Sequence, residues 1–448
     1  MKKTITLLIF LTALISNAQT NPAITSWLVN TTGITGRHYV AGNSTPIVDA
    51  SLANVQTVQY STNWAYVTTN GIPAYITGPF LDGNPSLATS QAGAIFKFPL
   101  NPTQNTGTAT VTTGGNIGLF KNGVALFDYR DGVSWKNSTS SLCGGPINPP
   151  CTGDGKWNRD AVVGERLGFD CSKAHPAMGN YHHHQNPSAF GLDTNVISTI
   201  CSTYPSDGLY VINTNAHSPL LGFAYDGFPI YGAYAYANTN GTGGIVRMKS
   251  GFQLRNITNR TVWADGTDVL DGPAVNTTYP LGYFREDYEF VSHLTDPSYL
   301  DAHNGRFCIT PEYPNGIYCY FTTVDANHNS AYPYVVGPTF YGNKTATKVN
   351  SITETVITLK NNSFSEASFN ITIAPNPAQD FIAIQSQMVE NDLKIELIDE
   401  LGKVVKTSQI LQGSTLGIIE TDTIYNGIYF VKISDGKNSK SFKVIINK

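Results

Sequence analysis

The stretch Leu393-Lys394-Ile395-Glu396-Leu397-Ile398 alternates aliphatic and charged side chains over most of its length. In an extended strand, successive side chains point to opposite faces, so this alternation gives one apolar and one polar face. Four similar stretches flank it: Asn370–Ile373, Phe381–Ile384, Gly427–Ile433 and Phe442–Ile446. Short alternating strands at this spacing, with turns at Asp399–Gly402 and Ser434–Gly436, predict a small β-sandwich.

The composition of the whole chain is typical of a β-rich protein. Its 448 residues include 41 Gly and 24 Pro, which interrupt long helices. Charged residues make up only 13%, whereas Tyr (24) and Phe (21) are abundant. The formal net charge of -4 does not indicate a nucleic-acid partner. We therefore expect a mainly β protein, in which a β-rich domain precedes the C-terminal β-sandwich.

The first residues predict export. Lys2 and Lys3 precede an apolar stretch at Ile5–Ile15, and the small residues Ser16 and Ala18 form a signal peptidase site. As a helix, an apolar stretch of this length spans roughly half of a bilayer core. We therefore expect a cleaved signal peptide over residues 1–18 and no transmembrane segment.

The chain changes character near residue 345. The last Cys is Cys319 and the last His is His328, and the final hundred or so residues switch to patterns of Ile, Val, Thr and Lys. The residues between Lys344 and Phe369 are polar and poor in aromatics, which is typical of a linker. The predicted parts are a signal peptide (1–18), a cargo domain (19–345), a linker (346–369) and the β-sandwich (370–448).

The β-sandwich resembles a known sorting domain. The resemblance rests on Ala374–Pro377, Asp399–Val405, Asn426–Lys432 and the basic, aliphatic end at Lys443–Lys448. These segments resemble the type A C-terminal sorting domain of type IX secretion substrates. The resemblance implies that the type IX machinery reads residues 370–448, and that the cargo is secreted or held at the cell surface after crossing the periplasm and outer membrane. The alternative is an accessory immunoglobulin-like or carbohydrate-binding module.

The cargo domain contains a group of histidines. Three are consecutive in Gly179-Asn180-Tyr181-His182-His183-His184, and this segment is followed by Asp226–Gly232 and Thr310–Pro314. These segments resemble the YHYH-domain family, which is named for a Tyr-His-Tyr-His motif, with a motif core at about residues 170–320. The chain departs from the motif at its third position, where His183 replaces Tyr. The resemblance implies a domain of uncharacterised activity.

The motif itself predicts a metal site. If Tyr181–His184 is extended, His182 and His184 share one face, and Tyr181 and His183 share the other. A third imidazole from the neighbouring segment, that of His217, would give the three-histidine geometry of a catalytic metal site.

Zinc or copper suits such a site, because both bind imidazole and oxidised cysteines offer no thiolate. His175 is a candidate for a fourth ligand or for a hydrogen-bond partner of a ligand. The alternatives are histidines that hydrogen-bond to loop carbonyls and histidines that act in metal-free acid–base catalysis.

Asp226 is the candidate catalytic carboxylate. It begins the Gly- and Pro-rich loop Asp226–Gly232, which could place it beside the histidines. In the alternative, this loop is a tight turn in which Asp226 only caps the backbone.

The six cysteines predict disulfides, because their number is even and the expected compartment is oxidising. Proximity in the sequence favours the pairs Cys143–Cys151, Cys171–Cys201 and Cys308–Cys319, the last across a hairpin with its turn at 312–316.

Three classes of function remain open. The first is an exported or cell-surface protein with a His-lined metal site. The second is a surface adhesion or glycan-binding protein without metal chemistry, whose partner would be a surface polysaccharide. The third is a metal-independent hydrolase, whose pH profile would be bell-shaped.

Processing at both ends is the prediction that follows from the two targeting segments. We expect the exported form to begin near Gln19 and to end between residues 345 and 369, as mass spectrometry of the culture supernatant and cell surface would show. Intact chain in the cytoplasm, or unaltered export after deletion of residues 370–448, would contradict the prediction.

Overall fold

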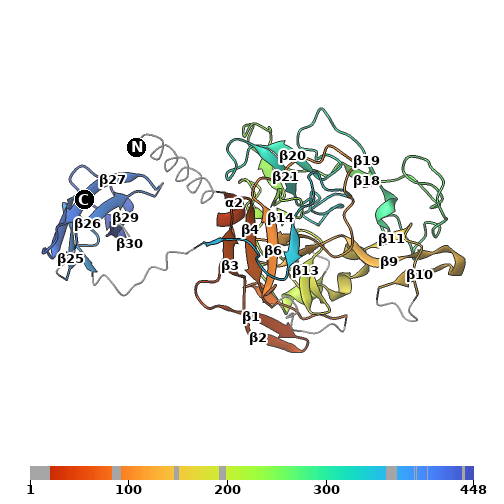
Figure 1. Ribbon diagram of the computed structural model, residues 1–448, viewed down its shortest axis with the longest axis horizontal. Coiled ribbons are helices and arrows are strands. Elements are labelled where there is room, and N and C mark those ends of the chain that lie inside the picture. Colours follow the sequence, from red (N-terminus) through yellow and green to blue (C-terminus); the bar gives the residue numbers. More distant parts are fainter. Residues whose placement is uncertain are drawn as a thin grey trace. The chain divides into compact units, whose positions relative to one another are not determined.

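The computed structural model describes residues 21–82, 92–145, 151–190, 198–359, 371–387, 389, 391–400, 402–435 and 439–448 (Figure 1). The chain divides into two compact units, Met1–Leu359 and Lys360–Lys448. The predicted signal peptide lies outside the described residues. No helix in the described part of the chain is long and apolar enough to cross a bilayer.

The first unit is built on two large sheets. The five-stranded sheet has the order β22 (Thr347–Val349), β6 (Ala94–Pro99), β4 (Trp64–Thr69), β3 (Val55–Tyr60) and β23 (Ile357–Thr358). The eight-stranded sheet has the order β12 (Ala174–Ala177), β13 (Asn180–His183), β8 (Ala125–Phe127), β7 (Asn116–Phe120), β14 (Leu220–Ala224), β15 (Pro229–Tyr231), β21 (Ile317–Phe321) and β20 (Gly305–Cys308).

Smaller elements complete this unit. The three-stranded sheets are β2 (Asn43–Leu52), β1 (Thr35–Val40) and β5 (Ile76–Thr77), and β10 (Ser141–Gly144), β9 (Arg130–Lys136) and β11 (Asn158–Asp160). The pairs are β16 (Tyr234–Tyr236) with β17 (Ile245–Arg247), and β18 (Phe252–Leu254) with β19 (Tyr288–Phe290). The short helices are α2 (Pro22–Thr25), α3 (Ala161–Gly164), η1 (Asn137–Thr139), η2 (Arg166–Gly168), η4 (Thr199–Ser202) and η5 (Arg285–Asp287).

Aromatic side chains join the two large sheets. Phe98 of β6 and Phe223 of β14 have ring centroids 6.3 Å apart, and the Trp27 ring lies 5.6 Å from the Phe98 ring and 5.4 Å from the Phe223 ring. All three side chains are buried. Burial of large apolar surfaces such as these is the main favourable term in folding, so this contact helps to hold in place the eight-stranded sheet, of which the histidine strand β13 is a member.

The predicted linker begins as part of the five-stranded sheet. Strand β22 pairs with β6, and strand β23 pairs with β3, so both are edge strands of the first unit. The linker prediction is therefore wrong for residues 347–349 and 357–358. Short, exposed edge strands are held by backbone hydrogen bonds and need no apolar pattern, which is why the polar sequence concealed them.

The second unit is a β-sandwich, as predicted. Its sheets are β24 (Ile371–Ala374), β25 (Phe381–Ser386) and β28 (Leu416–Glu420), and β27 (Val404–Ile410), β26 (Leu393–Ile398), β29 (Gly427–Ser434) and β30 (Ser439–Ile446). Leu393, Ile395 and Leu397 share one buried core with Ile382 and Ile384 of the other sheet. Strands β27 and β28 were not predicted.

Two of the three predicted disulfides are present, Cys143–Cys151 and Cys171–Cys201. Cys308 and Cys319 are buried thiols on the β20–β21 hairpin, which was predicted. They are diagonal neighbours, because Cys308 lies opposite Ile317 and Cys319 opposite Arg306. Their thiol groups contact each other, but no S–S bond joins them. The predicted third disulfide is therefore wrong.

We accordingly predict two free thiols in the chain. The native protein should react slowly with a thiol reagent, because both sulfurs are buried, and the denatured, unreduced protein should react at two sites. Peptide mapping after alkylation should identify these sites as Cys308 and Cys319. Complete resistance of the denatured chain to alkylation would show a third bridge instead.

Candidate metal centre

The β12–β13 hairpin carries two of the three histidines at the site. Its turn contains Met178 (φ 48°) and Gly179 (φ 80°), and positive φ at both central residues is the mark of a tight type I′ hairpin turn. The resulting register places His175 directly opposite His182. His184 follows β13, and alternation along the strand gives its side chain the same face as that of His182.

The opposite face of β13 anchors the strand to the core. The Tyr181 hydroxyl donates to Asp170 Oδ2 at 2.8 Å, and the same carboxylate accepts from the backbone N–H groups of Gly78 and Ser172. Tyr75 Oη lies 2.8 Å from His183 Nε2, and burial lowers the pKa of His183 to about 3. A neutral His183 is thus part of the packing, as expected for the face that turns away from the site.

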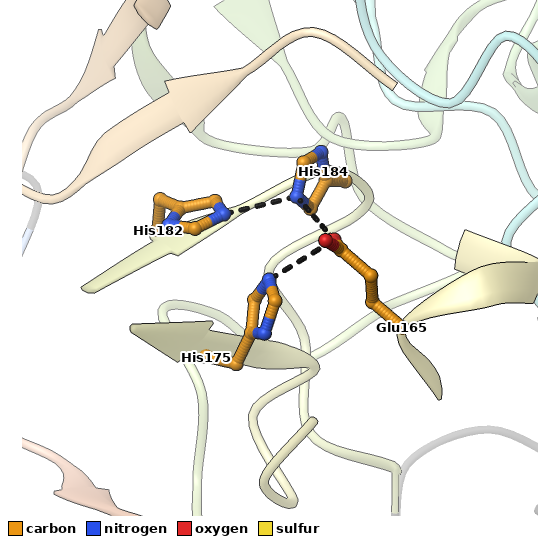
Figure 2. A group of neighbouring side chains, drawn as sticks. All are labelled: Glu165, His175, His182 and His184. Carbon is orange, nitrogen blue, oxygen red and sulfur yellow. Dashed lines mark hydrogen bonds and ion pairs between the residues drawn. The ribbon is translucent and has the colours of Figure 1, made fainter. Parts of the chain in front are cut away.

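Four side chains converge on the first face (Figure 2). They are Glu165, His175, His182 and His184, and one ligand atom from each lies within 4.8 Å of all the others. We call this group the His–Glu cluster. The three histidines are buried, whereas the Glu165 side chain is 22% exposed, so Glu165 occupies the side nearest to solvent.

Hydrogen bonds to the backbone fix the tautomers of two of these rings. His182 Nδ1 lies 2.7 Å from the carbonyl oxygen of Asn180, and His184 Nδ1 lies 2.6 Å from that of Asp128. A carbonyl oxygen only accepts, so each Nδ1 carries a proton and each Nε2 of a neutral ring carries a lone pair. These two Nε2 atoms are 2.9 Å apart, so two lone pairs face each other unless a proton or a metal ion lies between them.

The other two members approach the same point. Glu165 Oε2 lies 3.1 Å from His175 Nε2 and 3.1 Å from His184 Nε2. Even so, Glu165 Oε2 and His175 Nε2 are buried and have no aligned hydrogen-bond partner among the described residues. Buried polar atoms usually have a partner, and an ion in contact with both atoms would supply one.

Electrostatics at the cluster favours a cation. Burial lowers the pKa of His175, but hydrogen bonds and charge interactions with Asp82 and Glu165 outweigh it and raise the pKa to about 9. Burial raises the pKa of Glu165, but hydrogen bonds and charge interactions with His175 and His184 hold it below its usual range. Burial and the neighbouring His184 and His175 hold the pKa of His182 well below its usual range. The anionic carboxylate of Glu165 therefore stabilises positive charge beside it, which is either the protonated ring of His175 or a metal ion in place of that proton.

The spacing of the His–Glu cluster fits a transition metal ion. Ligand atoms about 2.1 Å from a tetrahedral ion lie about 3.4 Å from one another. The separations of 2.9 Å and 3.1 Å are slightly shorter than this, and all four ligand atoms lie within 4.8 Å of one another. Phe127 stacks on His182 at 3.8 Å, and Phe169 contacts His175 edge-on at 5.0 Å, so aromatic walls enclose the group.

The structure places His217 outside the His–Glu cluster. Its Nδ1 is 2.8 Å from Ser218 O, and its ring packs against Tyr231 and Tyr236. The prediction treated His217 as a neighbour of β13 because the segments are close in sequence. In the sheet, β8 and β7 lie between β13 and β14, and three strand spacings amount to about 14 Å. The prediction that His217 completes the site is therefore wrong.

Asp226 also lies elsewhere, in the turn between β14 and β15. Its Oδ2 accepts from the Tyr320 hydroxyl at 2.6 Å and from the Gly342 N–H at 2.8 Å, and its Oδ1 accepts from Phe228 N–H at 3.3 Å. Burial raises the pKa of Asp226 to about 6, against the opposing effect of these donors. This is the backbone-capping role of the alternative interpretation, and the structure does not bring Asp226 to the histidines.

Sequence reasoning missed Glu165 altogether. It caps the C-terminus of α3, a four-residue helix with little periodic signal, and it faces the histidines only because η2 turns the chain there. The one available signal was its position in the sequence, ten residues before His175 and just upstream of the motif core.

Comparison with known families gives two matches. The model of the YHYH protein family matches residues 95–333, which include the whole His–Glu cluster. The model of the secretion system C-terminal sorting domain matches residues 372–447, which form the β-sandwich. No curated protein matches the chain.

The Tyr181–Asp170 contact predicts a pH-dependent loss of stability in Tyr181→Phe. We expect a cost of about 1–3 kcal/mol, because a buried acceptor loses its donor. Burial raises the pKa of Asp170 to about 7 although its hydrogen bonds oppose this, so the carboxylate contributes less to stability as pH rises from about 4 to 7. Without the Tyr181 hydroxyl as donor, the Asp170 carboxylate is harder to ionise in the folded protein. The loss of stability in Tyr181→Phe should therefore be larger at pH 8 than at pH 5.

Urea unfolding followed by Trp fluorescence measures this cost, because all 5 Trp residues lie in the first unit. Tyr279→Phe is the matched control, because the Tyr279 hydroxyl has no hydrogen bond in the described part of the chain. Equal effects of the two substitutions would contradict the anchoring role of Tyr181.

Proposed function

We propose that the His–Glu cluster binds one transition metal ion outside the cell. The chain belongs to the YHYH protein family, and its residues 372–447 match a secretion sorting domain. The observation that carries the proposal is the pair of opposed Nε2 lone pairs on His182 and His184. The misaligned carboxylate of Glu165 supports it independently. Histidines with a purely structural role would be expected to use both ring nitrogens as hydrogen-bond partners, as buried polar groups usually do.

Zinc or copper is the ion that we propose. Imidazole nitrogen suits both ions, and one carboxylate oxygen completes a ligand set that is common for zinc. Thiolates are not available at this position, because four of the cysteines form disulfides and the other two lie on β20 and β21. When bound, the ion would supply a Lewis acid or, if it is copper, a redox centre.

The four proposed ligands differ in how firmly they are held. His175, His182 and His184 are buried and fixed by the hairpin, so they form the permanent part of the ligand set. Glu165 is on the solvent side and comes from a different segment, so it is the ligand that an incoming molecule can most easily displace. We infer a centre that holds its ion through three histidines and exchanges its fourth ligand, as catalytic sites do.

The sorting domain supports export of this centre. The domain implies an interaction with the type IX machinery and a destination outside the cell or on its surface. In this setting the ion must be held tightly by the protein itself. Four preformed protein ligands, three of them buried, would provide such retention.

We predict one bound zinc or copper ion per chain, measured by elemental analysis after purification without a His tag and by titration of chelator-treated protein. His182→Ala and His184→Ala should each weaken binding by more than about 100-fold, since even partners of a ligand contribute 10- to 100-fold. Glu165→Gln should weaken it less, because the amide oxygen can still coordinate.

His217→Ala is the matched control, because His217 is a half-buried histidine outside the cluster. The affinity of this variant for the metal ion should equal that of the unaltered chain. Trp fluorescence unfolding would confirm that each variant is folded. A chain that contains no metal as purified and binds neither ion at micromolar concentration would reject the proposal, as would equal losses in His217→Ala and His182→Ala.

A further inference from the structure

A small cavity adjoins the His–Glu cluster. Its volume is about 60 Å³, and the rings of Phe169 and Phe190 form apolar walls. Each ordered water occupies about 10–15 Å³ of such a volume, so the cavity accepts a group of about four to six non-hydrogen atoms. It is therefore large enough for the head of a small molecule.

The polar lining of the cavity includes buried groups without a hydrogen-bond partner among the described residues. Gln185 lines the cavity and is only 3% exposed. Its side-chain Nε2 has no hydrogen-bond partner in the described part of the chain. Ser330 Oγ, also in the lining, has no partner there either. Two unsatisfied polar groups around one cavity each carry a desolvation cost that a bound ligand would remove.

Positive charge accompanies these donors. Arg166 lines the cavity, and its guanidinium forms no ion pair with a described carboxylate. Lys173 is 1% exposed and contributes its ammonium group, which also donates to Ser188 Oγ at 2.8 Å. The lining thus combines the guanidinium of Arg166 with neutral donors, which is the complement of an anion.

The cavity and the His–Glu cluster share their local structure. Arg166 follows Glu165 in the chain, and Gln185 follows His184. The Phe169 ring, a wall of the cavity, contacts His175 at 5.0 Å and lies 6.3 Å from His184. A molecule anchored in the cavity would therefore have the cluster close to its other end.

We propose that this cavity binds the carboxylate group of a small organic acid. A planar guanidinium and a planar amide match the two coplanar oxygens of a carboxylate, and the two Phe rings accommodate a short apolar remainder. The cavity is a carboxylate subsite, and its assignment to the substrate of the metal centre rests on the proposed function.

Acetate is the probe for the experiment, which uses the exported chain after chelator treatment, in buffers of constant ionic strength. Ligand-observed NMR should show saturable binding of acetate that phosphate does not displace at equal concentration. Gln185→Leu and Arg166→Gln should each weaken acetate binding at least about tenfold, because each removes a hydrogen bond to a charged group. Ser330→Ala is a smaller change and should weaken acetate binding about two- to fivefold. This variant replaces Gln185→Leu in the test if Gln185→Leu does not fold.

Lys156→Gln is the charge control, because Lys156 is exposed and does not line the cavity. No saturable binding, tighter binding of phosphate, or equal losses in Lys156→Gln and Arg166→Gln would overturn the subsite. If acetate binds only the zinc- or copper-loaded chain, and Gln185→Leu does not change its affinity, acetate is a direct ligand of the ion. This result would also overturn the subsite. If acetate binding depends on Gln185 in a chain that binds neither zinc nor copper, the subsite is supported and the metal centre is rejected.

Discussion

The buried carboxylate of Asp170 is the contact on which the geometry of the site depends. It accepts hydrogen bonds from the Tyr181 hydroxyl and from the N–H groups of Gly78, Ser172 and Ala174, so one side chain ties β13 to the segments before β12 and after β5. Because strand side chains alternate, fixing Tyr181 on one face also fixes His182 on the other. A slip of one residue would turn the histidines into the core and bury their lone pairs against apolar rings.

The division of labour along β13 explains the motif residue by residue. Its first and third positions, Tyr181 and His183, point into the core, where each has a hydrogen-bond partner. Its second and fourth positions, His182 and His184, point to the cluster. The replacement of the third-position Tyr by His183 therefore changes a packing residue, which keeps a polar ring contact with Tyr75, and leaves the ligand positions untouched.

Local pattern predicted more of this protein than proximity in the sequence did. The two-residue period was enough to predict the β-sandwich core around Ile395 and the shared face of His182 and His184. It could not reveal that β7 and β8, which come earlier in the chain, insert between β13 and β14 and separate His217 from the cluster. Nor could it find Glu165, whose direction is set by a helix of four residues. Both failures concern strand order and chain reversal, which depend on long-range packing.

All four members of the His–Glu cluster come from a single run of the chain, residues 165–184. Bringing them together closes a loop of about twenty residues, and the entropic cost of such a closure rises only slowly with length. The Cys171–Cys201 bridge lies partly within this run and restricts it further. The centre therefore has low contact order compared with the sheet that surrounds it, so its ligands can meet early in folding, before the slower long-range pairing of the strands is complete.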